Sequence, residues 1–556
     1  MTSAPASPTT KGWRPAGRLH LTAPIVRHAA ACAVLVALIV VVYGVSLGHQ
    51  FVFDDTSLVV DNELVQLPLS RAGELLTGTS GGISYRPLRI FSYMVDYRLG
   101  GGLDPAVFHA SNLVWHALTT VTVYALAYLT VGSLGGALAA ASLFAVHPLG
   151  SEAVVYVAGR RDLLCTLFVL LALLCWCRLL GAGSPGRVPR SAGVVRRGAL
   201  LLAMVAFAVL AMAAKEMAVV LPVLAVLLAV PLRRRDDGSQ PWSALGASVA
   251  ALLGVGLWLY GGVVASSLAK AGDGALAPQP ALSLRVLGRY LRLALWPSDL
   301  LADYRSGAFP LPAASIDGPA LAAALALALL VVTGASLLLR GSIAGAGLLW
   351  FVVALLPVAQ IVPYGEIVSE HNAYLALVGL ALATGRAVTV LSRARPRVVA
   401  AAVVALVVLL AVRSHVRALD WRDSLTLWRA TVATAPRSVR GQFNLGVAMM
   451  ADGDLLGARA VLDRARSLAP DDRDVLITSA TLAGRLGDFA AAEAYARRAI
   501  ELAPDTRAYT ALGWALVSQG NAPAAIESFE TAIALGGDPA DARRGLARAH
   551  SRGGPL

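Results

Sequence analysis

The chain has 556 residues, of which 57% are hydrophobic and 15% charged, and its formal net charge is +13. This composition excludes a soluble globular protein and a disordered chain, and it is typical of a polytopic membrane protein. The basic residues cluster in short connections between apolar runs, which indicates membrane orientation rather than nucleic-acid binding.

Apolar runs long enough to cross about 30 Å of hydrocarbon predict about eleven transmembrane helices. The stronger runs are 29–48, 107–130, 163–181, 244–265, 318–339, 342–362 and 372–392. The weaker runs are 134–149, 198–214, 217–232 and 397–413. The run 281–296 carries Arg285, Arg289 and Arg292, so we expect it to be interfacial or re-entrant rather than a crossing.

Charge in the connections predicts the orientation. Residues 1–28 form a basic leader, which places the N-terminus in the cytoplasm. Counted from there, the basic connections 179–197, 233–243 and 393–397 all fall on the cytoplasmic side. The first outer loop, 49–106, and the C-terminal residues then lie outside. We therefore expect a multi-pass protein of the cell membrane.

A repeat follows the apolar spans. Pro436, Pro470 and Pro504 are separated by 34 residues, a period that matches the tetratricopeptide repeat, in which paired helices stack into a solenoid. Such solenoids either cap a neighbouring domain or bind an extended polypeptide. The expected all-α organisation is a membrane bundle over 29–413, a linker with half a repeat over 414–436 and a repeat α-solenoid over 437–556.

Polar residues gather at the predicted outer ends of the apolar helices. The first outer loop contains Asp54, Asp55 and Arg86. Later outer segments contribute His147, Glu152, Arg160, Asp162, Lys215, Glu216, Asp303, Tyr304, Glu370 and His371. Carboxylates at this depth could deprotonate a hydroxyl acceptor, and basic side chains could hold a leaving phosphate. The arrangement suits a substrate whose tail lies in lipid and whose polar head projects outward.

Structural roles stay open for several of these groups. The pair Asp54 and Asp55 could cap a helix, His147 could bond a helix end, and Lys215 with Glu216 could form a local ion pair. We expect three neighbouring charges to be solvated in loops, namely Asp61, Glu63 and Arg161.

The order of the outer motifs resembles the transmembrane and tetratricopeptide repeat-containing O-mannosyltransferase family, from about residue 50 to the end of the repeats. The matching pieces are Phe51-Val-Phe-Asp-Asp55, Tyr85-Arg-Pro-Leu88, His147-Pro148 with Glu152, Gly159-Arg160 with Asp162-Leu-Leu164, Lys215-Glu216 and Ala302-Asp-Tyr304. Eukaryotic members usually show Glu-Arg-Tyr-Leu-Tyr where this chain has Glu370-His-Asn-Ala-Tyr374, so His371 replaces an arginine. The alanine-, arginine- and leucine-rich usage suggests a bacterial member.

The resemblance implies a GT-C glycosyltransferase fold and an activity. The expected enzyme moves a mannose-like sugar from a polyprenyl-phosphate carrier to hydroxyl groups of exported proteins, which the repeats present. Asp54 or Asp55 is the expected catalytic base. The expected contacts of the carrier phosphate are Arg86, Arg160, Lys215 and His371. The expected supporting polar residues are His147, Glu152, Asp162, Glu216, Asp303, Tyr304 and Glu370.

The sequence requires no cofactor and shows no metal-ligand set, although a divalent metal stays open. The four cysteines lie in apolar runs and are typical of core residues. No phosphate-binding glycine loop is found, which disfavours a soluble nucleotide-sugar donor. The expected partners are therefore the lipid-linked sugar and exported acceptor proteins, without nucleic acid.

Other functions predict other patterns. A polymerase or ligase of lipid-linked glycans would concentrate its site in a long late outer loop, whereas the longest outer loop here is the first. A transporter would place ionisable residues near helix midpoints, but the charges here lie at outer helix ends, with Arg386 the main exception. A scaffold that recruits partners through its repeats would not need the outer acidic motifs.

Overall fold

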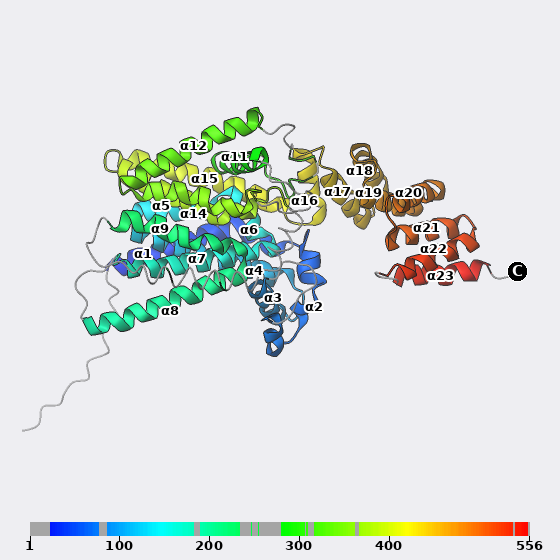
Figure 1. Ribbon diagram of the computed structural model, residues 1–556, viewed down its shortest axis with the longest axis horizontal. Helices are drawn as coiled ribbons and strands as arrows, with labels where there is room; N and C mark the ends of the chain where they lie inside the picture. The colour runs from blue at the N-terminus through cyan, green and yellow to red at the C-terminus, as the bar shows by residue number, and fades with distance from the viewer. Residues whose placement is uncertain are drawn as a thin grey trace, which may run out of the picture.

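The computed structural model describes residues 23–76, 86–182, 190–233, 246, 254, 280–305, 307–309, 316–361, 366–536 and 540–553. Every regular element within these residues is helical, and Figure 1 shows a bundle of long helices followed by a row of shorter ones. The predicted all-α fold class is therefore confirmed. Most of the predicted leader 1–28 and of the predicted span 244–265 lies outside the described residues.

Seven helices in the described part of the chain are long and apolar enough to cross a membrane. They are α1 (Ala23–Tyr43), α4 (Pro105–Val131), α7 (Arg160–Leu179), α8 (Arg190–Ala214), α12 (Gly318–Leu339), α14 (Tyr374–Leu391) and α15 (Pro396–Asp420). Helix α5 (Leu134–Val146) bends by 55° into Pro148–Val155, which makes an eighth candidate. Two shorter apolar helices are α9 (Leu221–Arg233) and α13 (Ile343–Leu355). Helices thus stand at each predicted span that lies within the described residues.

Glycines let α14 pack closely against both α5 and α13. A Cβ added at Gly347 of α13 would lie 2.3 Å from the carbonyl oxygen of Gly379, and one added at Gly136 of α5 would lie 2.6 Å from that of Gly385. Small residues of this kind allow transmembrane backbones to approach and gain dispersion contacts. The packing fixes α14, whose preceding turn, Glu370–Ala373, carries polar side chains into the end of the bundle.

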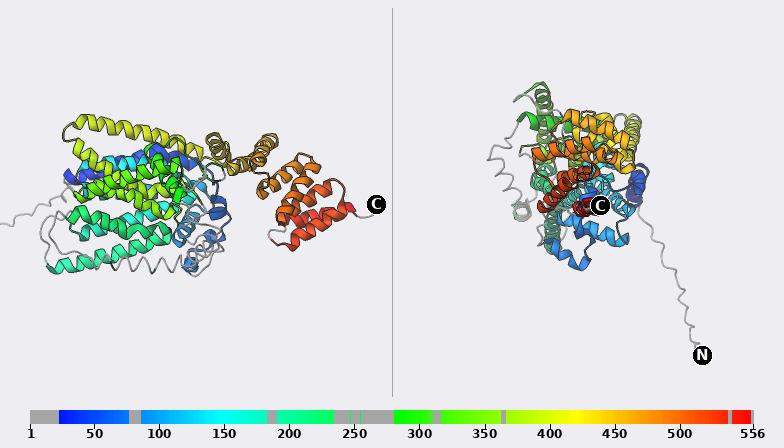
Figure 2. Two further views of the ribbon diagram at one scale, coloured as in Figure 1. Left: turned by 45° about the horizontal axis from the view of Figure 1, so that its top comes forward. Right: turned by 90° about the vertical axis from the view of Figure 1, so that its right-hand side faces the viewer.

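Short elements gather at the end of the bundle that faces the repeats, as Figures 1 and 2 show. These elements are α2 (Glu63–Gln66), α3 (Pro87–Leu99), α6 (Ser151–Val155) and α16 (Ser424–Thr434). The polar ends of the long helices and the first loop therefore meet in one region.

Helix α11 (Pro280–Leu295) has 16 residues, fewer than the roughly 20 needed for a crossing. Its arginines have partners beyond the helix: Arg285 pairs with Asp317, and Arg289 Nη2 donates to the carbonyl oxygen of Asp299 at 2.9 Å. We keep the prediction that this segment lies at the membrane interface.

Three consecutive helix pairs and one further helix extend away from the bundle (Figure 2). They are α17 (Val439–Asp452), α18 (Leu455–Leu468), α19 (Arg473–Arg485), α20 (Phe489–Leu502), α21 (Thr506–Ser518), α22 (Ala522–Ala534) and α23 (Ala540–Gly553). The second helix of each pair begins at a side-chain cap, provided by Asp454, Asp488 and Asn521. Recurrent caps and buried alanines explain why the 34-residue period folds as stacked helix pairs.

Candidate functional site

The first loop makes a strained turn immediately before its two aspartates. Phe53 has a φ of 57°, a left-handed conformation that a bulky side chain rarely adopts. Such a residue costs on the order of 1–3 kcal/mol and persists only where its surroundings hold it. The Phe53 ring is held between Tyr156 and Trp428, with centroids 5.9 and 5.4 Å away.

Asp55 is fully buried and holds the loop to the bundle. Its Oδ1 accepts a hydrogen bond from the Ala158 backbone N–H at 2.8 Å, and its Oδ2 accepts one from the Val52 N–H at 3.2 Å. Burial raises the pKa of Asp55 to about 7. With both oxygens occupied by backbone donors, this carboxyl group is suited to fixing the loop.

Asp54 is half-buried, and within the described residues no group donates a hydrogen bond to its carboxylate. Burial raises the pKa of Asp54, while the cations of Arg440, Arg161 and Arg305 act in the opposite direction. Of the two aspartates, Asp54 is therefore the one available to take a proton from a ligand.

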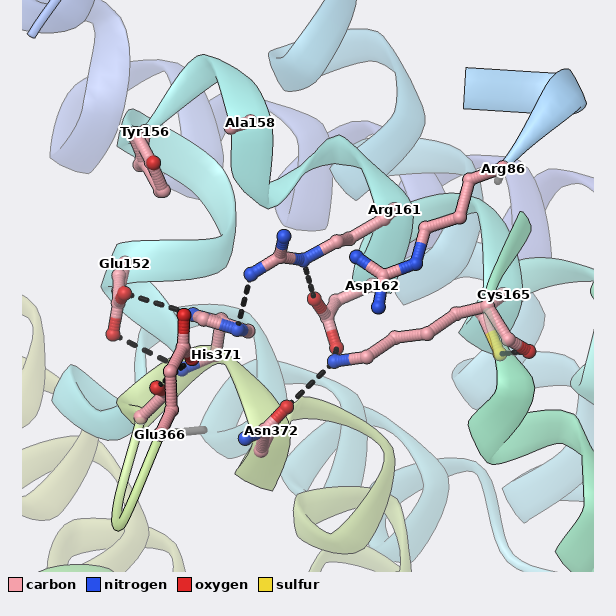
Figure 3. A network of polar contacts seen from close by, with 12 residues as sticks. Arg86, Glu152, Tyr156, Ala158, Arg161, Asp162, Cys165, Glu366, His371 and Asn372 are labelled. Carbon is pink, nitrogen blue, oxygen red and sulfur yellow. Dashed lines mark hydrogen bonds and ion pairs between the residues drawn. The ribbon is translucent and has the colours of Figure 1, made fainter. Parts of the chain in front are cut away.

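A buried polar network lies beside this loop, at the start of α7 (Figure 3). Arg161 Nη2 lies 2.7 Å from His371 Nε2, and Arg161 Nε lies 3.6 Å from Asp162 Oδ2. Lys215 Nζ donates to Asp162 Oδ1 at 2.7 Å and to Asn372 Oδ1 at 2.6 Å. The network joins α7, the end of α8 and the turn before α14.

His371 is held from its other side by Glu152. The two carboxylate oxygens of Glu152 lie 2.8 Å from His371 Nδ1 and 3.1 Å from the His371 backbone N–H. Since a guanidinium only donates hydrogen bonds, Nε2 accepts from Arg161 and Nδ1 carries the proton. These contacts assign a neutral imidazole between a carboxylate and an arginine.

The start of α3 adds two further cations. Arg86 Nη2 pairs with Glu216 Oε1 at 2.8 Å. Arg89 is buried, forms no ion pair with a described residue, and its Nε has no hydrogen-bond partner. The pKa of Arg89 is lowered to about 10, mainly by burial. The neighbouring cations Arg86 and Arg161 act in the same direction, and Tyr93 opposes them. This clustering of cations favours an anionic ligand.

A second cluster surrounds Glu370 and ties the turn before α14 to the end of α15. Glu370 Oε1 accepts from Tyr304 Oη at 2.8 Å and from the Leu301 N–H at 2.5 Å. Arg417 Nη2 lies 3.4 Å from Glu370 Oε2. This cluster positions the segment that carries Asp303.

The structure thus brings together most residues singled out by the sequence and places two elsewhere. Arg160 pairs with Asp96, and its Nε donates to Asn112 Oδ1 at 2.7 Å, in a separate buried cluster. His147 Nε2 bonds the carbonyl oxygen of Ala294 at 3.0 Å. His147 also caps the turn Pro148–Gly150, which leads to Glu152.

Sequence reasoning missed several residues of this region. The expectation that Arg161 is a solvated loop charge is wrong, since Arg161 is buried against His371. Arg89 lies in the first turn of α3, three residues after Arg86, the residue that precedes the helix, and this short spacing of two arginines could have revealed it. Arg440 lies in the repeats and carried no local signal.

Among the residues that the structure describes, no group of three or more histidine, cysteine, aspartate or glutamate side chains is placed to hold a metal ion.

Comparisons with known proteins agree with the repeat and with the family resemblance. A family model described as tetratricopeptide repeat matches residues 409–473, 477–539 and 510–554. The chain is 26% identical over 467 residues to the mouse protein O-mannosyl-transferase TMTC4, covering 74% of this chain and 62% of the relative. It is 37% identical over 169 residues to mouse protein O-mannosyl-transferase TMTC1, a match that covers 29% of this chain and 18% of the relative.

A solved structure, ArnT from Cupriavidus metallidurans, aligns with a TM-score of 0.35 and 14% identity, covering 94% of this chain and 77% of that one. The chain spans about 62% of the length of the mouse TMTC4 relative. The resemblance to the O-mannosyltransferases with transmembrane helices and tetratricopeptide repeats, predicted from the motifs, is confirmed by the sequence relatives.

Proposed function

From its relationship to the transmembrane and tetratricopeptide repeat O-mannosyltransferases, we propose that this chain is a membrane glycosyltransferase. It moves a mannose-like sugar from a polyprenyl-phosphate carrier to hydroxyl groups of exported proteins. The observation that carries the proposal is that Asp54 lies near a buried group of cations. Asp54 is half-buried, and no group within the described residues donates a hydrogen bond to its carboxylate.

The reaction needs a base that takes the proton of the attacking hydroxyl and cations that stabilise the negative charge of the leaving phosphate. The hydroxyl oxygen of the acceptor attacks the anomeric carbon of the sugar, and its proton passes to Asp54. The bond between that carbon and the phosphate oxygen breaks, and the phosphate leaves with the electron pair. A carboxylate is needed because an alcohol is a poor nucleophile until its proton is removed as the new bond forms.

The cation cluster suits the leaving phosphate because its positive charge is only partly balanced. Arg86 is paired with Glu216, and Lys215 with Asp162. Arg89 has no anionic partner among the described residues. A phosphate oxygen would supply that partner, and hydrogen bonds between charged groups are among the strongest that proteins form. We therefore assign Arg89 and Arg161 to the phosphate, and we assign Arg160 to the support of α3 and α4.

An apolar cavity supports a lipid-borne donor. It has a volume of about 370 Å³, and its walls come from α5, α11, α13, α14 and α15. Its lining includes Phe144, Leu348, Leu377, Leu406 and Leu410, together with His147. An isoprenoid tail buries apolar surface in such a cavity. His147, which lines the cavity, precedes the turn Pro148–Gly150 that leads to Glu152.

The same arrangement supports an outward-facing site. The Gln50 N–H donates to the carbonyl oxygen of Arg422 at 2.9 Å, so the first loop and the linker lie at one end of the bundle. With a cytoplasmic N-terminus, that end lies outside the cell membrane, where an exported acceptor would be found.

The orientation is tested with reporter fusions in intact cells. A reporter inserted after residue 420 should be accessible from outside, and one inserted at about residue 237 should be protected. A cytoplasmic reporter at 420 would contradict an outer site.

Replacing the base should remove most transfer. We expect Asp54→Asn to lower the rate of sugar transfer by about 10²–10⁴-fold, because the amide keeps the shape but cannot take a proton. The assay uses a radiolabelled polyprenyl-phosphate-linked sugar in membranes. Asp61→Asn, an exposed change in the same loop, is the matched control. Near-normal transfer by Asp54→Asn would move the base to Glu152, Glu216 or Glu370.

Substitution of two buried arginines should have different effects, one on sugar transfer and the other on stability. Arg89→Gln should lower kcat/KM by about 10²-fold through loss of a phosphate contact, with little change in thermal stability because no ion pair to a described residue is lost. Arg160→Gln should instead destabilise the protein by about 3–5 kcal/mol, because it leaves Asp96 buried without its cation. Thermal unfolding of the detergent-solubilised variants and transfer kinetics separate the two. The assignment fails if Arg89→Gln transfers normally.

A further inference from the structure

The first helices of the linker and repeats reach the Asp54 loop directly. Trp428 of α16 packs edge-on against Phe53. The ring centroids of Tyr156 and of Trp421, at the end of α15, lie 5.1 Å apart. At Gly307, where φ is +90°, an added Cβ would lie 2.3 Å from the carbonyl oxygen of Arg437. The junction between bundle and repeats is therefore a close contact beside the proposed base.

Arg440 of α17 is the charged residue at the centre of this contact. Its guanidinium lies over the Phe53 ring, 5.0 Å from the centroid, and its Nε lies 3.3 Å from Asp303 Oδ2. The start of α17 is fixed by Ser438, whose hydroxyl accepts from the Gly441 N–H at 3.0 Å. Asp303 also pairs with Arg305 at 3.4 Å. A repeat-domain cation thus contacts the strained residue that precedes Asp54.

We propose that Arg440 is a positioning residue of the transfer site, through which the seated repeat domain holds the Asp54 loop in its working conformation. The inference rests on the proposed role of Asp54 as the base. It gives the repeat domain a part in catalysis beyond presentation of the acceptor. The left-handed Phe53 turn needs support from outside the loop, and Arg440 and Trp428 supply it from the linker and the repeats.

The same contact acts on the proton affinity of Asp54. Four charged groups from other elements face this carboxyl: Arg440 of α17, Arg161 of α7, Arg305 and Glu366. Asp55 and Tyr156 are the neighbouring titratable groups. Burial raises the pKa of Asp54, and Arg440 is the cation that opposes this most. Loss of Arg440 should therefore leave Asp54 protonated up to a higher pH, and a protonated carboxyl cannot serve as a base.

The test is the pH dependence of kcat/KM, which reports the pKa of the base in the free enzyme. The full chain in membrane vesicles is given a polyprenyl-phosphate-linked mannose and a Ser/Thr-containing peptide. Arg440→Gln should shift the acidic limb upward by about half a pH unit or more, as expected for loss of one nearby unit charge. Arg440→Lys should keep the wild-type limb. Arg497→Gln removes an exposed repeat-domain charge paired with Glu493 and should change nothing.

An unshifted acidic limb in Arg440→Gln would overturn the proposed role, because the Arg440 contact acts on Asp54 through its charge as well as through its packing. If Arg440→Gln does not accumulate, Arg440→Met carries the same test, because its side chain still packs over Phe53 without the charge. The Asp54→Asn variant separates the two proposals. An active Asp54→Asn removes the base assignment itself, whereas an inactive Asp54→Asn with an unshifted Arg440→Gln limb overturns only the role of Arg440.

Discussion

A hydrogen-bonded chain from Glu152 through His371 to Arg161 joins three segments at the end of the bundle, and the site depends on it. Charged groups at this depth have lost most of their hydration, so each must find a partner inside the protein. The neutral imidazole lets a carboxylate orient an arginine without adding another cation. Arg161 is thereby fixed near Lys215 and Arg89, and the partly balanced charge of these cations is the basis of the phosphate site that we propose.

The fold could be predicted because its signals are local. Apolar run length determines where helices cross, and the 34-residue spacing of prolines determines the repeat. Part of the site was predictable for the same reason. Glu152, Asp162 and Lys215 belong to short motifs at helix ends, and the structure places these three in adjoining networks with His371. The different roles of Asp54 and Asp55 were harder to predict, because the role of Asp55 depends on a hydrogen bond from the backbone N–H of Ala158, far along the chain.

Other features could not be read from the sequence. Arg160 and Arg161 are neighbours at the start of α7, yet successive helical residues point about 100° apart, so one joins Asp96 and the other joins His371. Arg440 stands in a repeat whose pattern gives no hint of a contact with Phe53. Such contacts arise from the way distant elements pack, which composition and spacing do not encode.

The central claim is that this chain attaches a sugar to exported proteins, and mass spectrometry of glycopeptides tests it most directly. Exported proteins are compared between cells that make the wild-type chain, cells that make Asp54→Asn, and cells without the chain. The account predicts hexose on serine and threonine residues in the first sample only. Identical glycopeptides in all three samples would contradict it.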